Sequence, residues 1–197
     1  MTIRLRLPAA APGARLTGLG SAQPDNVVTN DDLSERMDTN DQWIRERVGI
    51  QSRRIAEDGT SLVDMASDAG ARAVKDAGLA PNEIDTVIVA TCTMPNFIPN
   101  AAAQTAERIG IPTPGAFDLN AACAGFCFGV GSAADLVRAG TSRHALVIGA
   151  EKLSDYLDWS DRATAIIFAD GAGAAPGHRT DADRVRVRGR ADHRRAG

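Results

Sequence analysis

The sequence predicts an α/β fold with a mainly parallel sheet and covering helices. A continuous apolar, β-branched run at 85–91 is typical of a parallel strand that is covered on both faces. Segments of this kind alternate along the chain with segments whose apolar residues recur at helical spacing. Such alternation of strands and helices favours the α/β class.

The N-terminal region predicts only short elements. Residues 1–14 are mixed in composition and contain prolines, so we expect a loose lead-in there. A strand is expected at 15–21, and the glycine, proline and asparagine residues in and after it predict turns. A short helix follows near Asn30, with Asn30 or Asp31 as its cap.

Longer elements follow in alternation. Helices are expected at 60–78, 101–109 and 123–139, each with a glycine at its end. The helix at 60–78 can start at Thr60 or Ser61 and has an apolar face that suits a core-facing scaffold. Besides 85–91, strands are expected at 115–119, 145–149 and 164–168, and the first of these is expected to be buried.

Cys123 lies where the predicted strand 115–119 passes into the predicted helix 123–139. A thiol at this junction feels the free amide N–H groups and the positive dipole end of the helix, which favour the thiolate. Alanine and glycine neighbours leave room for a slender acyl substrate. A nucleophile is therefore one interpretation. The other is a small buried core residue, since free cysteines are often buried.

Trp43 and Arg47 are four residues apart and share one face of a predicted helix. An indole beside a guanidinium can stack on a purine and hold a phosphate. The alternative is amphipathic packing of the tryptophan beside a solvated arginine. A second candidate contact is the apolar loop 94–99 with Phe97 and Ile98, which either meets a partner or turns Phe97 inward.

Composition and charge limit the function classes. The 197 residues are 44% hydrophobic and 24% charged, which is ordinary for one globular domain. No apolar run of eighteen residues predicts a membrane span, and the N-terminus lacks a signal-peptide pattern. Three cysteines without zinc-type spacing fit a reducing compartment, so we expect a cytoplasmic protein without a bound metal.

The charge is distributed unevenly. Residues 1–175 carry a net charge of −7 and residues 176–197 a net charge of +4. An acidic body gives no electrostatic footprint for nucleic acid. Core-type residues become scarce after Ala175, where an arginine-rich segment begins. We expect 176–197 to be a disordered tail from an altered or mis-assigned reading frame.

The segment 117–126, around Cys123, resembles the active-site segment of the beta-ketoacyl-[acyl-carrier-protein] synthase III family of thiolase-like condensing enzymes. Further similar motifs occur in the same order at 38–44, 47–50, 161–164 and 168–174. The resemblance covers about 15–175, whereas proteins of this family are about twice as long. It implies the N-terminal half of the thiolase fold for 15–175.

The resemblance also implies a set of site residues. Cys123 corresponds to the nucleophile that takes the acyl group. Thr39, Trp43, Arg47 and Arg162 correspond to residues at the entrance for coenzyme A. A coenzyme A thioester is then a substrate, and no metal or redox cofactor is implied. In the family, the loop that holds Phe97 and Ile98 reaches a second subunit, which implies a homodimer.

The implied reaction is acyl transfer from an acyl-CoA of the acetyl-CoA type to Cys123, followed by decarboxylative condensation with malonyl-[acyl-carrier-protein]. This step initiates fatty-acid synthesis. The family's histidine and asparagine donors lie in its second half, and His144, His178 and His193 match no family motif, so we expect a catalytically incomplete chain. The alternatives are a related condensing enzyme or acyltransferase of secondary metabolism, and a non-catalytic dimerising remnant.

Overall fold

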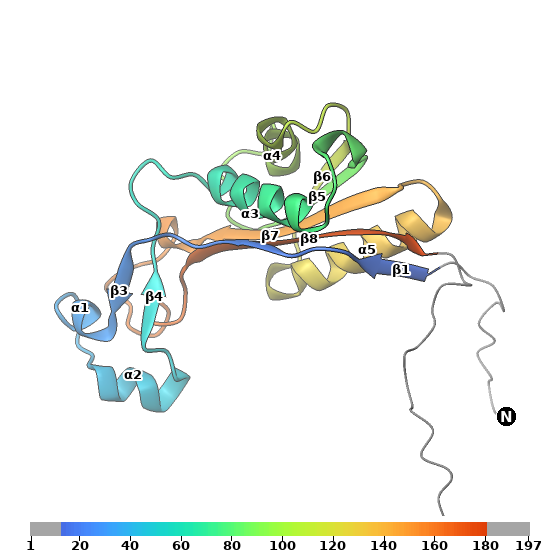
Figure 1. Cartoon of the computed structure of the whole chain (residues 1–197). Helices are drawn as coiled ribbons and strands as arrows, with labels where there is room; N and C mark the ends of the chain where they lie inside the picture. Colours follow the sequence, from blue (N-terminus) through green and yellow to red (C-terminus); the bar gives the residue numbers. More distant parts are fainter. Residues whose placement is uncertain (1–12, 181–197) are drawn as a thin grey trace, which may run out of the picture.

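The structure is a computed structural model that describes residues 13–180. They form a six-stranded mixed sheet with helices on both faces, and a two-stranded sheet beside it (Figure 1). The strands are β1 (Gly13–Leu16), β2 (Gly20–Ala22), β3 (Val27–Thr29), β4 (Ser52–Arg54), β5 (Thr86–Ala90), β6 (Gly115–Leu119), β7 (His144–Lys152) and β8 (Asp170–Thr180). The helices are α1 (Asn30–Ser34), α2 (Asp41–Val48), α3 (Leu62–Asp76), α4 (Ala101–Ile109) and α5 (Gly125–Ala139), with short 3-10 turns η1 (Pro81–Glu83), η2 (Ala122–Ala124) and η3 (Leu153–Asp155).

The large sheet confirms the predicted α/β class. Strand β5 lies between β6 and β7 and is parallel to both, while β8 runs antiparallel to β7. Both β1 and β2 pair with β8, again antiparallel. Parallel pairing is therefore confined to β6, β5 and β7, and β6 is an edge strand of the described sheet. The expectation that β6 is buried is wrong, since Gly115 and Phe117 are exposed.

The core lies on both faces of β5, whose five residues are all buried. Val87 and Val89 face α3 and α4, and Ile88 faces α5. Figure 1 shows α3 and α4 above the large sheet and α5 below it. This alternation is the period-2 pattern of a strand that is covered on both faces. Helix α3 starts at a capping box between Ser61 and Asp64, as the sequence predicts.

A second, smaller core lies beside the large sheet. It is built from β3, β4, α1, α2 and the segment before β8 (Figure 1). Its buried residues are Leu33, Met37, Ile44, Ala165 and Ile166. Helix α1 starts at a capping box between Thr29 and Asp32, so the predicted caps Asn30 and Asp31 lie just inside the helix.

The predicted strand at 164–168 is wrong. The chain forms turns there, in which the Ala165 N–H donates to the Asp161 carbonyl at 3.0 Å and the Asp161 carboxylate accepts from Thr164 Oγ1 at 2.7 Å. Ala165 and Ile166 are apolar because they fill the second core. The strand is β8 instead, whose glycine and alanine residues give a weak sequence signal.

Three predicted boundaries also differ. The strand expected at 15–21 is interrupted: it becomes β1 and β2, separated where the Thr17 N–H donates to the Pro176 carbonyl at 2.9 Å. The lead-in expected at 1–14 is wrong for Gly13 and Ala14, which belong to β1. The tail expected to start at 176 is wrong for 176–180, because these residues pair with β7 and β1 as part of β8. The remainder of the predicted tail, and 1–12, lie outside the described residues.

The segment Ala122–Ala139, with a mean hydropathy of 1.2, is long and apolar enough to cross a membrane by length and composition alone. It contains η2 and α5. The buried residues of α5, spaced by four, are Gly125, Gly129, Ala133 and Val137. A helix of this kind that packs against a sheet passes the same test. Its exposed face includes Phe128, which is 62% exposed.

Gly20 of β2 permits a close approach between the large sheet and α3. A Cβ atom at this position would lie 2.2 Å from the Ala69 carbonyl oxygen and 2.4 Å from the Ala73 backbone nitrogen. These are backbone atoms and cannot rotate away. By contrast, a Cβ atom at Gly131 of α5 would meet nothing within 4 Å.

We therefore expect Gly20→Ala to lower the free energy of unfolding by ~1–3 kcal/mol, the usual cost of overpacking. Gly131→Ala is the matched control, and it should leave stability unchanged or raise it by up to ~1 kcal/mol, because alanine favours helix. Urea unfolding followed by circular dichroism measures both. Equal effects of the two substitutions would contradict the described packing of β2 on α3.

Candidate functional site

The carboxyl ends of three parallel strands meet at one edge of the large sheet. Cys92 follows the end of β5, Cys123 follows the end of β6, and Glu151 lies at the end of β7. The pairing of Ala90 with both Leu119 and Gly149 fixes these ends side by side. Residues with chemical function therefore gather there although they are far apart in sequence.

A cavity of about 620 Å³ opens at this edge. Cys123, Cys92 and Glu151 all line it, together with Ser21, Gln23, Ala90, Ala122, Phe126, Gly149, Ala150, Leu153, Phe168, Gly171, Ala172 and Gly173. Most of these residues are apolar or small. The cavity therefore suits a slender, largely apolar group that ends near a thiol.

Cys123 lies in the tight turn η2 between β6 and α5. The residue before it, Ala122, has a φ of 45°, which is a strained value for a residue other than glycine. Helix α5 begins at Gly125, two residues later than the sequence predicts. The Cys123 side chain is exposed rather than buried in the core. The turn thus presents the thiol to the cavity and to solvent.

Neighbouring elements hold this turn in place. A Cβ atom at Gly125 would lie 3.1 Å from the Ala90 Cβ atom, so glycine lets α5 start close against β5. Strand β6 is fixed from the other side. The Asp118 carboxylate accepts from the N–H groups of Ala101 and Ala102 at the N-terminus of α4, at 2.8 Å each.

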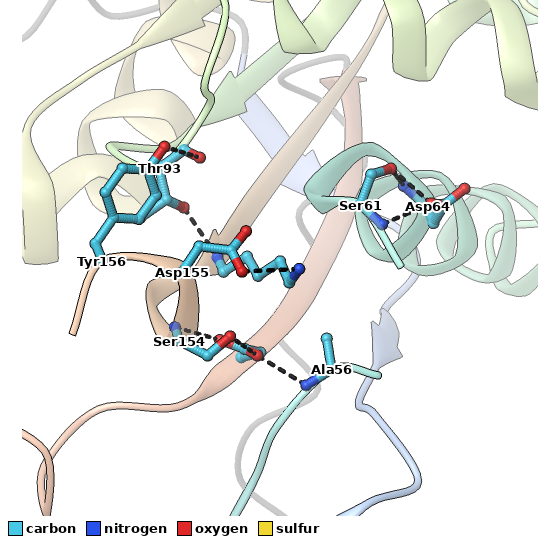
Figure 2. A network of polar contacts seen from close by, with 9 residues as sticks. Ala56, Ser61, Asp64, Thr93, Ser154, Asp155 and Tyr156 are labelled. Carbon is cyan, nitrogen blue, oxygen red and sulfur yellow. Dashed lines mark hydrogen bonds and ion pairs between the residues drawn. The ribbon is translucent and has the colours of Figure 1, made fainter. Parts of the chain in front are cut away.

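Glu151 fixes the segment after β5 beside the cavity. Its carboxylate accepts from the Cys92 N–H at 2.9 Å, from Thr93 Oγ1 at 2.5 Å and from Thr91 Oγ1 at 3.3 Å. Thr93 Oγ1 also accepts a hydrogen bond from the Lys152 N–H, and the Thr93 carbonyl accepts one from the Tyr156 hydroxyl (Figure 2). Burial and the Glu151 carboxylate raise the pKa of the Cys92 thiol.

Asp170 joins this region to the loop after β4. Its buried carboxylate accepts from the Ala56 N–H at 2.8 Å, from the Ser154 N–H at 2.9 Å and from Ser154 Oγ at 2.6 Å (Figure 2). The sequence alone does not single out Glu151 or Asp170 as site residues. The available signal was weak: each is an acidic residue at the end of an apolar segment.

Trp43, Arg47 and Arg162 come together as the sequence predicts. The Cζ atom of Arg47 lies 4.0 Å from the Trp43 ring centroid, and that of Arg162 lies 4.9 Å from it. Arg162 comes from a distant part of the chain, and its Nη1 donates to the Asp38 carbonyl at 2.8 Å. We call Trp43, Arg47 and Arg162 the tryptophan–arginine cluster. An aromatic face with two cations suits a nucleotide.

The other predicted residues differ in how they lie. Thr39 directly precedes the cap of α2, and its buried Oγ1 has no hydrogen-bond partner among residues 13–180. Phe97 and Ile98 are 96% and 90% exposed, so the alternative that Phe97 turns inward is wrong. The ring centroids of His144 and His178 lie 5.6 Å apart where β7 begins, at the opposite end of β7 from Glu151. His193 lies outside the described residues.

Comparison with known proteins gives consistent matches. A sequence model described as 3-Oxoacyl-[acyl-carrier-protein (ACP)] synthase III matches residues 117–188. Beta-ketoacyl-[acyl-carrier-protein] synthase III 4 of Streptomyces coelicolor is 48% identical over 163 residues, which are 83% of this chain and 52% of that protein. Synthase III 2 of Vibrio cholerae is 50% identical over 161 residues, 82% of this chain and 44% of that protein. The chain spans about half the length of the curated relatives it matches.

Solved structures agree with these matches. The 3-oxoacyl-[acyl-carrier-protein] synthase III from Aquifex aeolicus is 40% identical with a TM-score of 0.83, over 85% of this chain and 54% of that one. The priming beta-ketosynthase from the R1128 polyketide biosynthetic pathway is 41% identical with a TM-score of 0.84, over 90% of this chain and 53% of that one.

The contacts of Cys92 lead to a test of the cavity wall. At neutral pH, a raised pKa leaves less of the Cys92 thiol as reactive thiolate. Replacing the neighbouring anion by Glu151→Gln should lower that pKa and speed alkylation of Cys92 by iodoacetamide, because a larger share of the thiol is then thiolate. Mass spectrometry of the Cys92 peptide measures the rate.

Asp155→Asn is the matched control for this test. It also removes one carboxylate, but Asp155 contacts Lys152 rather than Cys92. It should leave the alkylation rate of Cys92 unchanged. A Glu151→Gln chain whose Cys92 reacts no faster would contradict the described contact.

Proposed function

We propose that this chain carries out the acyl-accepting half of the beta-ketoacyl-[acyl-carrier-protein] synthase III reaction. The chain belongs to this family and shares its thiolase-like fold over about half of its relatives' length. The reaction is acyl transfer from acyl-CoA followed by condensation with malonyl-[acyl-carrier-protein]. The single observation that carries the proposal is the exposed Cys123 in a strained turn at the carboxyl edge of the sheet. That turn opens onto a cavity of about 620 Å³ whose lining is mostly apolar or small.

The first step uses only groups near Cys123. The thiolate attacks the thioester carbonyl of acyl-CoA, and the electron pair of the C=O bond moves to its oxygen. Backbone N–H groups close to the turn stabilise that oxyanion. When the carbonyl reforms, coenzyme A leaves as a thiolate that takes up the proton lost by Cys123, and the acyl group remains on Cys123.

The nucleotide end of acyl-CoA binds at the tryptophan–arginine cluster. Trp43 stacks on the adenine ring, while Arg47 and Arg162 attract the phosphates. Thr39 is assigned to the same ligand because it lies between Asp38, whose carbonyl accepts from Arg162, and Asn40, the cap of α2. Support for this assignment is the convergence of both arginines on one indole ring from separate parts of the chain.

The second step needs more than residues 13–180 supply. Loss of carbon dioxide from the malonyl group leaves a carbanion that neutral hydrogen-bond donors must stabilise. Within the described part of the chain, His144 and His178 lie away from the cavity. We therefore infer that the chain accepts an acyl group but does not complete condensation. None of these steps calls for a metal or a redox cofactor.

A second candidate is a condensing enzyme of secondary metabolism. The similarity to the R1128 priming beta-ketosynthase, at a TM-score of 0.84, favours it. Both candidates use Cys123 in the same way and differ in the acyl group they accept and in the pathway they serve. The remaining alternative, a dimerising remnant without chemistry, is separated from both by the reactivity of Cys123.

The proposal also includes a location and partners. Cys92, Cys123 and Cys127 are all free, which suits the reducing cytoplasm. An acyl carrier protein delivers the malonyl group. Two copies of the chain associate through the loop at Phe97 and Ile98, which exposes a pair of large apolar side chains.

Acylation of Cys123 tests the proposed function directly. After incubation with acetyl-CoA, the peptide that contains Cys123 should gain one acetyl group. Cys123→Ser should abolish formation of the acetyl thioester. Cys127→Ser is the control and should leave the label in place, because Cys127 is another exposed thiol, one turn further along α5, that the proposed reaction does not use. Mass spectrometry identifies the modified residue. Equal labelling of Cys123 and Cys127 would mean nonspecific transfer and would contradict the proposal.

The loop contact gives a separate prediction. Phe97→Ser combined with Ile98→Ser should weaken self-association of the chain by about tenfold or more, as loss of an apolar anchor does. Leu19→Ser is the control, because Leu19 is also a large exposed apolar residue, at 70%, on another part of the surface. Sedimentation velocity measures the association. An unchanged dimer in the double variant would place the interface elsewhere.

A further inference from the structure

Arg53 of β4 is a buried arginine whose guanidinium faces neutral groups. The residue is only 5% exposed. Within residues 13–180, no carboxylate forms an ion pair with it. Burial lowers the pKa of its guanidinium. An apolar side chain would fill the same space at a lower desolvation cost, so the arginine calls for another explanation.

The guanidinium connects three segments. Its Nη2 donates to Asn30 Oδ1 at 2.9 Å and to the Ile166 carbonyl at 3.2 Å. Its Nη1 donates to the Val28 carbonyl at 3.4 Å. Its planar fork can serve acceptors in several directions at once, which lysine cannot do.

Asn30 extends this connection to both ends of α2. It is 1% exposed, and its Nδ2 donates to Asp41 Oδ1 and to the Ile50 carbonyl, each at 2.8 Å. Asp41 is the first residue of α2, and Ile50 follows the helix by two residues. Asn30 is thus placed between the start and the end of the helix that carries Trp43 and Arg47.

Ile166 extends the connection to the other side of the tryptophan–arginine cluster. It lies four residues after Arg162 in the turn segment before β8. Its side chain is buried in the second core, and its carbonyl accepts from Arg53. Arg53 therefore reaches α2 through Asn30 and the Arg162 segment directly. These are the two parts of the chain that must keep their spacing for both Arg47 and Arg162 to stay close to the Trp43 ring.

We propose that Arg53, through Asn30, is a positioning residue that holds the two sides of the tryptophan–arginine cluster at the spacing which binds a nucleotide. The inference rests on the proposed function of that cluster. Arg53 touches no substrate itself. Its loss should weaken nucleotide binding while leaving the chemistry at Cys123, which belongs to the large sheet, intact.

The test uses Arg53→Lys in the 197-residue chain, with coenzyme A as the probe in isothermal titration calorimetry. Lysine keeps the charge but cannot span Asn30 and Ile166 together. The dissociation constant for coenzyme A should rise roughly tenfold, the scale of a lost hydrogen bond to a charged group. Arg54→Lys is the matched control: Arg54 is the next residue of β4, and its Nη1 donates to the Pro24 and Asp25 carbonyls, away from the cluster. It should change the constant less than about twofold.

A second readout separates positioning from general destabilisation. The rate of Cys123 acylation by acetyl-CoA should recover in Arg53→Lys when the acetyl-CoA concentration is raised, because binding of acetyl-CoA is weakened while the acylation rate of the bound complex is unchanged. Asn30→Ser, which keeps the arginine but shortens the bridge to α2, should show the same pattern. An acylation rate that stays low at saturating acetyl-CoA, or an unchanged dissociation constant in both variants, would overturn the inference.

Trp43→Ala distinguishes failure of the inference from failure of the proposed function. If Trp43→Ala weakens binding of coenzyme A and Arg53→Lys does not, only the positioning role of Arg53 is wrong. If Trp43→Ala binds as the unaltered chain does, the cluster is not the nucleotide site, and the inference about Arg53 falls with it.

Discussion

The parallel pairing of β5 with β6 on one side and β7 on the other is the constraint on which the rest of the structure depends. Ile88 pairs with Phe117 and with Val147, and this register sets where all three strands end. A slip of one residue would turn the buried side chains of β5 to the wrong face. It would also separate Cys123 from Cys92 and Glu151. The same strand register therefore determines both the packing of the core and the positions of Cys92, Cys123 and Glu151.

The molecule has two cores with different tasks. The large sheet, with α3, α4 and α5, fixes the turn of Cys123, while Trp43 packs against the smaller core, which also contains Ile166, four residues after Arg162. The Asp170 carboxylate at the start of β8 accepts from the Ala56 N–H after β4, and Ala56 also packs against the large core, so this contact connects the two parts. A ligand with a reactive thioester at one end and a nucleotide at the other would use both parts at once. Binding of the nucleotide end and reaction of the thioester with Cys123 can therefore be measured separately.

The sequence predicts the parts that depend on local pattern. The buried run of β5, the Ser61 cap of α3 and the strand-to-helix junction at Cys123 follow from periodicity and capping chemistry. The family motifs also identify Trp43, Arg47 and Arg162, which the structure places together. Two errors concern β8 and the segment before it. Ala165 and Ile166 are apolar because they fill a small core built by distant segments, and the glycine and alanine residues of β8 have low strand propensity. Glu151, Asp170 and Arg53 are missed because their partners are far away in sequence.

The central claim is that Cys123 alone accepts the acyl group, at a site complete enough for this step and incomplete for condensation. The most direct test is to mix the chain rapidly with acetyl-CoA and to measure the coenzyme A released over time by chromatography. We expect a burst of about one equivalent of coenzyme A per chain and no further rapid release when malonyl-[acyl-carrier-protein] is added. The absence of a burst, or continued turnover with formation of ketoacyl product, would contradict it.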